Sequence, residues 1–334
     1  MRRRVSRPSV PKRRERRDHP LSGLPDSSLL ALSSVCRAAG IRPPGTQARQ
    51  VREPASTTFG TSTVHRGRQG RCAVRLVRYR RAEHTGRGAL IGEYIHEMGD
   101  TSLGSSRPGP RIAALDEVEL LAPCDPRVIV CAGSNYAGQI AEKQRPWPTQ
   151  PPLFLKAPNA VVGPGAAVVH PAGLRRLEYE GELAVVIGRT ARDVPAASFA
   201  DYVLGYTCAN DITADDWRAD GQWTRAKSAD TFCPLGPWIE TDVADPGALR
   251  LDTLVNGRTV QDGSTADMVF GVGELLAFVT RWITLQPGDV LLTGSPAGVG
   301  PLVPGDRVEV RIEGVGTLSN PVVGAEPLGE PGTT

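Results

Sequence analysis

The stretch EYEGELAVVIG, residues 178–188, joins a cluster of carboxylates to an apolar run that has the length and composition of a buried strand. Side chains alternate between the two faces of a strand, so Glu180 and Glu182 are predicted to point to the same side. Two like charges held close together cost free energy unless a cation neutralises them, which favours a hard divalent ion as their partner. The alternative interpretation is a strand edge on which both carboxylates face water.

A third carboxylate strengthens the metal interpretation. Asp211 lies in GYTCANDITADD, residues 205–216, where an apolar strand ends and the chain leaves the sheet with side chains free to ligate. Three oxygen ligands suit Mg²⁺ or Mn²⁺. No histidine follows His170, which disfavours an imidazole-rich zinc or iron site built around these carboxylates.

The regions on either side predict many short strands and few helices. The 334 residues include 37 glycines and 29 prolines, a composition that favours turns over long helices. The predicted strands of the larger part are RVIVCAG, PLFLKA, ELAVVIG, VLGYTCANDI, LRLDTLVNG, DVLLTGSP and DRVEVRIEG. Helices are predicted in YAGQIAEKQ and in GVGELLAFVTRWI, whose apolar stripe includes Leu275, Leu276 and Trp282. The fold class expected is mainly β (α+β).

Three segments are expected along the chain: a disordered basic tail over residues 1–70, a small β-rich module over 73–125, and a catalytic domain over 126–325. The tail holds 15 Lys and Arg against 4 Asp and Glu, whereas the remaining residues hold 24 against 32. An acidic body with a basic tail argues against a nucleic-acid-binding fold. A transit peptide and an over-extended translation start both remain open for the tail.

The composition also indicates the cellular compartment and the kinds of metal site to expect. No apolar run approaches the roughly 18 to 20 residues that span a bilayer, so no membrane-spanning segment is expected. The six cysteines include no CxxC pair and no histidine at zinc-finger spacing, which excludes the common structural zinc sites. Free thiols in a reducing, cytoplasmic compartment are the simpler interpretation.

Nine motifs in a fixed order resemble the fumarylacetoacetate hydrolase family over residues 127 to 323. They are G-x-N-Y (133–136), F-x-K (154–156), Y-E-x-E (179–182), N-D (210–211), A-K-S (226–228), P-x-G-P (234–237), V-N-G (255–257), D-M (267–268) and P-G-D-V-x-x-T-G-S-P-A-G-V-G (287–300). Each motif is weak alone, but their common order makes chance similarity very improbable.

The resemblance implies a mixed β-sandwich roll that forms a homodimer, with Mg²⁺ or Mn²⁺ on Glu180, Glu182 and Asp211. It also implies a small substrate carrying a 2-oxo or 2-hydroxy-2-enoic acid, whose enolate the metal stabilises. The residues assigned to catalysis on this basis are Gln139, Glu142 and Lys227, and those assigned to substrate binding are Tyr136, Lys156, Arg218, Thr293 and Ser295. The competing interpretations are surface ion pairs for the lysines and an ordinary Gly/Pro turn for residues 293–298.

Two positions depart from the family pattern. Hydrolases of the family carry a histidine three residues before a glutamate, and here those positions hold Gln139 and Glu142. A carboxamide has no pKa near neutrality and cannot shuttle the proton that an imidazole would. The family's Arg and Gln positions after Asp211 hold Asp215 and Arg218, so Arg218 either meets an anionic substrate or pairs with Asp215.

The function expected from these residues is metal-dependent hydrolysis of a C–C bond in an acylpyruvate or fumarylacetoacetate-like acid. Isomerisation or decarboxylation through the same enolate is the next alternative, because neither reaction needs the water that Gln139 cannot activate. A metal-binding homologue without catalysis is the non-enzyme alternative. A nucleic-acid module ranks third, since only the basic tail supports it.

Overall fold

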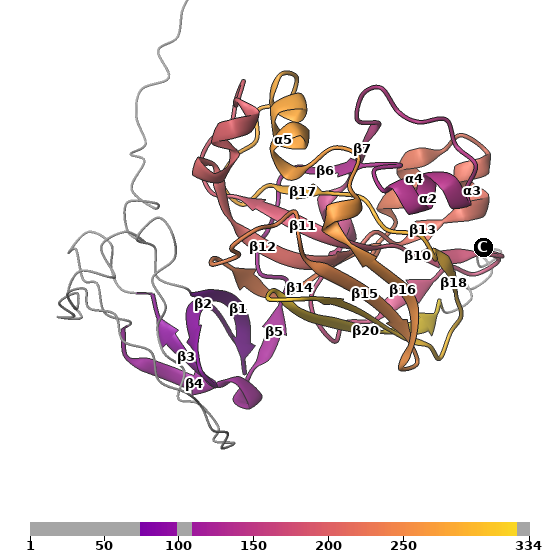
Figure 1. The fold of residues 1–334 in the computed structure, drawn as a ribbon. Helices are drawn as coiled ribbons and strands as arrows, with labels where there is room; N and C mark the ends of the chain where they lie inside the picture. The colour runs from indigo at the N-terminus through magenta and orange to yellow at the C-terminus, as the bar shows by residue number, and fades with distance from the viewer. Residues whose placement is uncertain (1–73, 99–108, 326–334) are drawn as a thin grey trace, which may run out of the picture.

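The computed structural model describes residues 74–98 and 109–325 (Figure 1). The predicted tail over residues 1–70 lies outside the described residues. Cys36 and Cys72 lie outside them as well.

The largest element of the described chain is one mixed sheet of twelve strands. Its main path runs β4-β3-β2-β1-β14-β12-β11-β17-β6-β7, while β5 pairs with β1 and β8 with β14. The bounds are β1 (Arg75–Arg81), β2 (His84–Ile91), β3 (Tyr94–Glu97), β4 (Arg111–Ala114), β5 (Glu119–Leu121), β6 (Ile129–Ala132), β7 (Leu153–Lys156), β8 (Val161–Val162), β11 (Gly181–Ile187), β12 (Val203–Asn210), β14 (Cys233–Glu240) and β17 (Val290–Leu292).

Two smaller sheets complete the β structure, a three-stranded sheet in the order β13-β10-β18 and a five-stranded sheet in the order β16-β15-β19-β20-β9. Their bounds are β9 (Val168–His170), β10 (Leu177–Tyr179), β13 (Thr213–Ala214), β15 (Arg250–Val255), β16 (Arg258–Ser264), β18 (Gly300–Leu302), β19 (Arg307–Ile312) and β20 (Gly316–Gly324). The helices are α2 (Ala137–Glu142), α3 (Asp215–Ala219), α4 (Trp223–Ser228) and α5 (Val272–Thr280), with 3-10 turns at Leu115–Glu117, Pro158–Ala160, Ala196–Asp201 and Thr265–Asp267.

Strand β11 lies in the middle of the fold and is buried along its whole length. Leu183 and Val185 pack in a core shared with β15, β19 and α5, whereas Ala184 and Val186 pack in the core on the other side. The predicted alternation therefore holds, and it places Glu182 on the same face as Ala184 and Val186. A strand covered on both faces is the most rigid platform that a sheet offers for a functional site.

The N-terminal strands extend the same sheet while keeping a core of their own. β1 pairs antiparallel with β14 through Arg75↔Glu240 and Leu76↔Ile239 (Figure 1). Val77, Tyr79 and Ile95 form a separate small apolar cluster. The expected mainly β class with a small N-terminal β-rich module is confirmed.

The helices show where local pattern misleads. Leu275, Leu276 and Val279 of α5 are fully buried, but Trp282 is 70% exposed because the helix ends at Thr280, so its place in the apolar stripe was wrong. Helices α3 and α4 were not predicted as elements, because DDWRA and WTRAKS carry no apolar periodicity. Both lie close to the candidate site and supply two of its charged residues.

Candidate metal and substrate site

The three predicted carboxylates meet at one buried point. Glu180 lies between β10 and β11, Glu182 is the second residue of β11, and Asp211 directly follows β12. One oxygen from each lies within 4.8 Å of the others. The backbone fixes the arrangement, since the Asp211 amide donates to the Glu180 carbonyl (2.8 Å) and the Glu180 amide to the Asn210 Oδ1 (3.0 Å).

Both predicted lysines reach this cluster from other elements. Lys227 of α4 donates from Nζ to Glu180 Oε2 (3.1 Å) and to Asp211 Oδ2 (2.5 Å). Lys156, at the end of β7, donates to Asp211 Oδ1 and to the Ile212 carbonyl (3.1 Å). Both side chains are fully buried, so they are not surface ion pairs.

Burial and charge act in opposite directions on these groups. Burial raises the pKa of Glu180, and the Asp211 charge adds to the rise while Lys227 opposes it. Burial alone would raise the pKa of Asp211, but Lys156 and Lys227 together outweigh it and lower that pKa below its usual value. Burial likewise would lower the pKa of Lys227, yet Asp211 and Glu180 raise it, so this ammonium stays protonated at neutral pH.

Glu182 differs from its two neighbours because no lysine reaches it. Among the residues that the structure describes, it forms no salt bridge, and its Oε2 accepts one hydrogen bond from the Gly294 amide (2.7 Å). Burial, with the charges of Asp211 and Glu180, holds its pKa well above the ordinary range. A buried carboxylate without a counter-ion, in a set of donors made only of oxygen, fits a hard divalent cation such as Mg²⁺ or Mn²⁺.

The loop at residues 293–298 closes one side of the site. The Thr293 hydroxyl donates to the Leu183 carbonyl (2.9 Å), and Ser295 Oγ accepts from Gln261 Nε2 (2.8 Å). Tyr179 Oη donates to the Gly298 carbonyl (2.9 Å). These bonds hold the loop against β11 and use part of the hydrogen-bonding capacity of Thr293 and Ser295, while the Gly294 amide between them binds Glu182.

Tyr136 precedes α2 and is fully buried. Burial raises the pKa of its phenol far above the usual value, and the Glu182 charge adds to this. In the described part of the chain its hydroxyl has no hydrogen bond of normal geometry. A neutral, unpaired donor of this kind is suited to a polar ligand atom.

Helix α2 carries Gln139 and Glu142 in different environments. Gln139 is buried, whereas Glu142 is exposed and its carboxylate accepts from the Gly298 amide at 3.1 and 3.3 Å. No hydrogen bond joins the Gln139 side chain to Glu142 among the described residues. The helix is therefore attached to the loop through Glu142.

Arg218 of α3 pairs with Asp215, which is one of the two arrangements expected from the sequence. Its guanidinium also lies 3.5 Å from Glu178 Oε2 and 4.0 Å from Glu180 Oε1, at the edge of the carboxylate cluster. Pairing with Asp215 therefore does not remove Arg218 from the site.

Sequence reasoning missed the buried amides that hold the site together. Asn135 Nδ2 donates to the carbonyls of Thr293 (2.8 Å) and Phe270 (3.0 Å), and Gln261 joins Gly181 to Ser295. Asn135 lies in the G-x-N-Y motif, so the motif itself was a signal. Gln261, in VNGRTVQDG, has no local feature that marks it.

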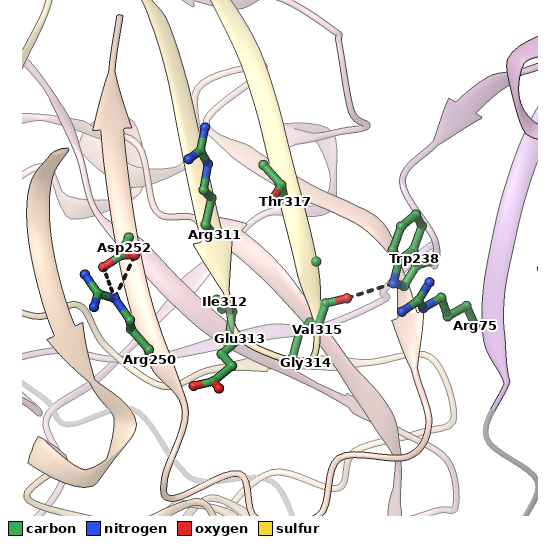
Figure 2. A pocket seen from close by; sticks show the side chains of 11 residues that line it. Arg75, Trp238, Arg250, Asp252, Arg311, Ile312, Glu313, Gly314, Val315 and Thr317 are labelled. Carbon is green, nitrogen blue, oxygen red and sulfur yellow. Dashed lines mark hydrogen bonds and ion pairs between the residues drawn. The ribbon is translucent and has the colours of Figure 1, made fainter. Parts of the chain in front are cut away.

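A cavity of about 430 Å³ opens elsewhere on the molecule (Figure 2). It is lined by Arg75, Trp238, Arg250, Arg311 and the hairpin turn at 312–317, and none of the predicted site residues contributes to it. Each arginine already pairs with a carboxylate, namely Glu240, Asp252 or Glu309. The arginines of this cavity are therefore paired and partly exposed, unlike the buried Glu182.

Comparison with known families identifies the class of protein. A model described as the fumarylacetoacetate (FAA) hydrolase C-terminal domain matches residues 128–323, and one described as Rv2993c-like, N-terminal, matches residues 74–123. The chain belongs to the fumarylacetoacetate hydrolase family, and the β-roll expected from the motifs is confirmed.

Individual relatives within this family carry different activities in their names. The human mitochondrial oxaloacetate tautomerase FAHD2A is 43% identical over 220 residues, which cover 62% of this chain and 70% of that protein. A 5-carboxymethyl-2-hydroxymuconate delta-isomerase from Mycobacterium smegmatis is 41% identical with a TM-score of 0.69, covering 76% of this chain and all of that one.

A third relative bears on the metal. A maleylpyruvate hydrolase from Sphingobium sp. SYK-6, solved in complex with manganese(II) and pyruvate, is 31% identical with a TM-score of 0.63, covering 75% of this chain and all of that one. Members of the family are thus enzymes acting on small molecules, and a divalent ion is bound by at least one neighbour. No helix within residues 74–98 and 109–325 is long and apolar enough to cross a bilayer.

Proposed function

We propose that this protein is a divalent-metal-dependent enzyme that interconverts the keto and enol forms of a 2-oxo or 2-hydroxy-2-enoic acid. The observation that carries the proposal is the buried cluster of Glu180, Glu182 and Asp211, in which Glu182 has no ion-pair partner within residues 74–98 and 109–325 while Lys227 stays protonated alongside. A divalent cation bound there would supply the positive charge that stabilises a developing enolate.

The charged residues of the chain add to this electrostatic stabilisation. Lys227 and Lys156 bring two ammonium groups to the point where negative charge would develop, in a site from which water is largely excluded. Because its pKa is raised, Lys227 acts as a fixed positive charge and not as a base. Arg218 lies at the edge of the cluster, where an anionic substrate carboxylate would approach.

Polar groups around the cluster are suited to orienting the substrate. The Tyr136 hydroxyl, which has no partner among the described residues, is free to donate to a substrate oxygen, and Thr293 and Ser295 flank the Gly294 amide that binds Glu182. Glu142 is the carboxylate available for proton transfer, because it is exposed and held by a single backbone amide. Gln139 has no titrating group and is assigned a hydrogen-bonding role.

We favour isomerisation as the reaction, whereas the sequence favoured hydrolysis. Gln139 stands where hydrolases of the family have the histidine that would activate water. In addition, the relatives named as a tautomerase and an isomerase are more identical to this chain than the one named as a maleylpyruvate hydrolase. Hydrolysis of an acylpyruvate is the second candidate, supported by the accessible carboxylate of Glu142. Decarboxylation would use the same enolate.

The test is a substrate panel with Mn²⁺ or Mg²⁺ supplied and with EDTA as the control. Enol forms of oxaloacetate, 2-hydroxydienoates and acylpyruvates are followed by loss of enol absorbance, and the products are identified by NMR. We expect conversion of enol to ketone without chain cleavage. Pyruvate release would favour hydrolysis, carbon dioxide release would favour decarboxylation, and absence of turnover across the panel would support a metal-binding homologue without catalysis.

We also infer that the protein is a cytoplasmic homodimer. Each subunit contains the 73–125 module and the 126–325 catalytic domain. The family resemblance supports the dimer. The four described cysteines are free and buried, which supports a reducing compartment. Light scattering on the purified chain tests the oligomeric state, with a monomer as the contradicting result.

A further inference from the structure

The face of β11 opposite the carboxylates is held by one buried amide side chain. Glu180 and Glu182 point to one face, so Gly181 between them lies on the other. There the Gly181 amide donates to Gln261 Oε1 at 3.0 Å. Gln261 belongs to β16 and is 1% exposed.

The other end of the same side chain binds the loop at residues 293–298. Gln261 Nε2 donates to Ser295 Oγ (2.8 Å) and to the Pro296 carbonyl (3.0 Å). The neighbouring residue Gly294 provides the amide that binds Glu182 Oε2. Gln261 therefore joins the strand that carries two candidate metal ligands to the loop that orients one of them.

Close packing leaves this connection little room to shift. A Cβ atom on Gly181 would lie 2.1 Å from Thr253 Oγ1, and a Cβ atom on Gly298 would lie 2.3 Å from the Val260 carbonyl oxygen. A β-bulge in the pairing of β15 with β16 immediately precedes Gln261, since Thr253 pairs with Gln261 but Leu254 pairs with Thr259. Bulges commonly re-aim a side chain near a functional site.

We propose that Gln261 is a positioning residue, which keeps the strand bearing Glu180 and Glu182 at a fixed distance from the loop bearing Gly294 and Ser295. It touches neither metal nor substrate in this role, and the inference rests on the metal-dependent function proposed above. Groups that orient metal ligands in this way typically change metal affinity or activity by about 10- to 100-fold when they are removed.

The experiment compares Gln261→Met with Asn320→Leu as a matched control. Methionine preserves the length of the side chain but has no amide to bridge Gly181 and Ser295. Asn320 is equally buried, and its Nδ2 donates to the Gly163 and Ala166 carbonyls (2.9 and 2.8 Å), so its loss perturbs a buried amide of the same kind away from the site. Thermal midpoints of both variants establish how much each fold is weakened.

Two readouts do not depend on turnover: the Mn²⁺ dissociation constant by calorimetry, and hydrogen exchange in peptides covering residues 177–187 and 293–300. For Gln261→Met we expect Mn²⁺ binding about 10-fold weaker, and faster exchange in both peptides. For Asn320→Leu we expect both readouts to match the parent even where the thermal midpoint falls. Ser295→Ala, which removes one arm of the bridge and is milder, should show a smaller change in the same direction.

The possible outcomes separate the two proposals. Unchanged Mn²⁺ affinity in Gln261→Met, with or without faster exchange, would reduce Gln261 to a structural residue and overturn the inference. Equal losses of affinity in Gln261→Met and Asn320→Leu would overturn it too. If Gln261→Met does not fold, Ser295→Ala decides the matter by the same criteria. A parent chain that binds no Mn²⁺ would instead overturn the proposed function, and with it the positioning role.

Discussion

The carboxylate cluster and the arginine-lined cavity both collect charged side chains, but they balance them differently. At the cavity each of Arg75, Arg250 and Arg311 has its own carboxylate, and the arginines are about half exposed. In the cluster Asp211 pairs with Lys156 and Lys227 and Glu180 pairs with Lys227, whereas the third buried carboxylate, Glu182, pairs with neither lysine. The paired, half-exposed arginines give the cavity little electrostatic strain, whereas unevenly paired charge under burial points to the carboxylate cluster as the place for chemistry.

The largest expected effect comes from Asp211→Ala. It removes one of the three proposed oxygen ligands and takes from both buried lysines the carboxylate that they share, so tight Mn²⁺ binding should be lost. Breaking a buried ion pair typically costs about 3 to 5 kcal/mol of stability. Calorimetry and chemical denaturation measure the two effects.

Asp252→Ala is the matched change at the cavity, where it removes one of the two carboxylates that pair with the exposed Arg250. Neither metal affinity nor stability should change appreciably, because exposed ion pairs are screened by water. Equal losses of metal affinity and stability in Asp211→Ala and Asp252→Ala would show that the cluster and the cavity do not differ in how they balance charge.

The next effect concerns the reaction. Gln139→His restores the family's proton-transfer pair with Glu142, and a positioned general base typically contributes about 10²- to 10⁴-fold. If the enzyme hydrolyses its substrate, pyruvate release should rise by a factor in this range. If it isomerises without activating water, turnover should stay flat or fall.

Glu142→Ala measured alongside tests whether α2 takes part at all. If turnover by Glu142→Ala equals turnover by the parent, this helix takes no part in the mechanism. Arg250→Ala at the cavity is the control expected to leave turnover unchanged.

A moderate effect is expected from Glu182→Gln in EDTA. The pKa of Glu182 is raised above its unfolded value, so its contribution to stability is present at low pH and is lost as the pH rises through the folded-state pKa. The variant lacks this loss, and its thermal midpoint should exceed that of the parent at neutral and alkaline pH and converge with it in acid. The variant should also bind Mn²⁺ weakly. A parent that is more stable at every pH would show that Glu182 is already compensated.

The smallest effect is expected on deleting residues 1–70. These residues contain no site motif and no apolar periodicity, so metal affinity and oligomeric state should match those of the full chain. Calorimetry and light scattering check this. Loss of soluble protein would show that the segment contributes to folding.

Local patterns were sufficient to predict three neighbouring carboxylates and insufficient to predict the elements that surround them. Glu180 and Glu182 follow from strand alternation, and Asp211 from its place at the end of an apolar strand. The exposure of Trp282 and the helices α3 and α4 were missed, because helix ends and short polar helices depend on packing and not on periodicity.

The sequence by itself determined the mainly β class and, through strand alternation and a strand end, the neighbouring carboxylates, because that geometry is local; the two lysines were assigned through the family resemblance. Only the tertiary structure decided which partners they meet. Lys156 reaches Asp211 across 55 residues, and Gln261 reaches Gly181 across 80. Such contacts depend on strand order, on register and on the bulge before Gln261, which arise when the layers of the fold pack together and which no single stretch of sequence encodes.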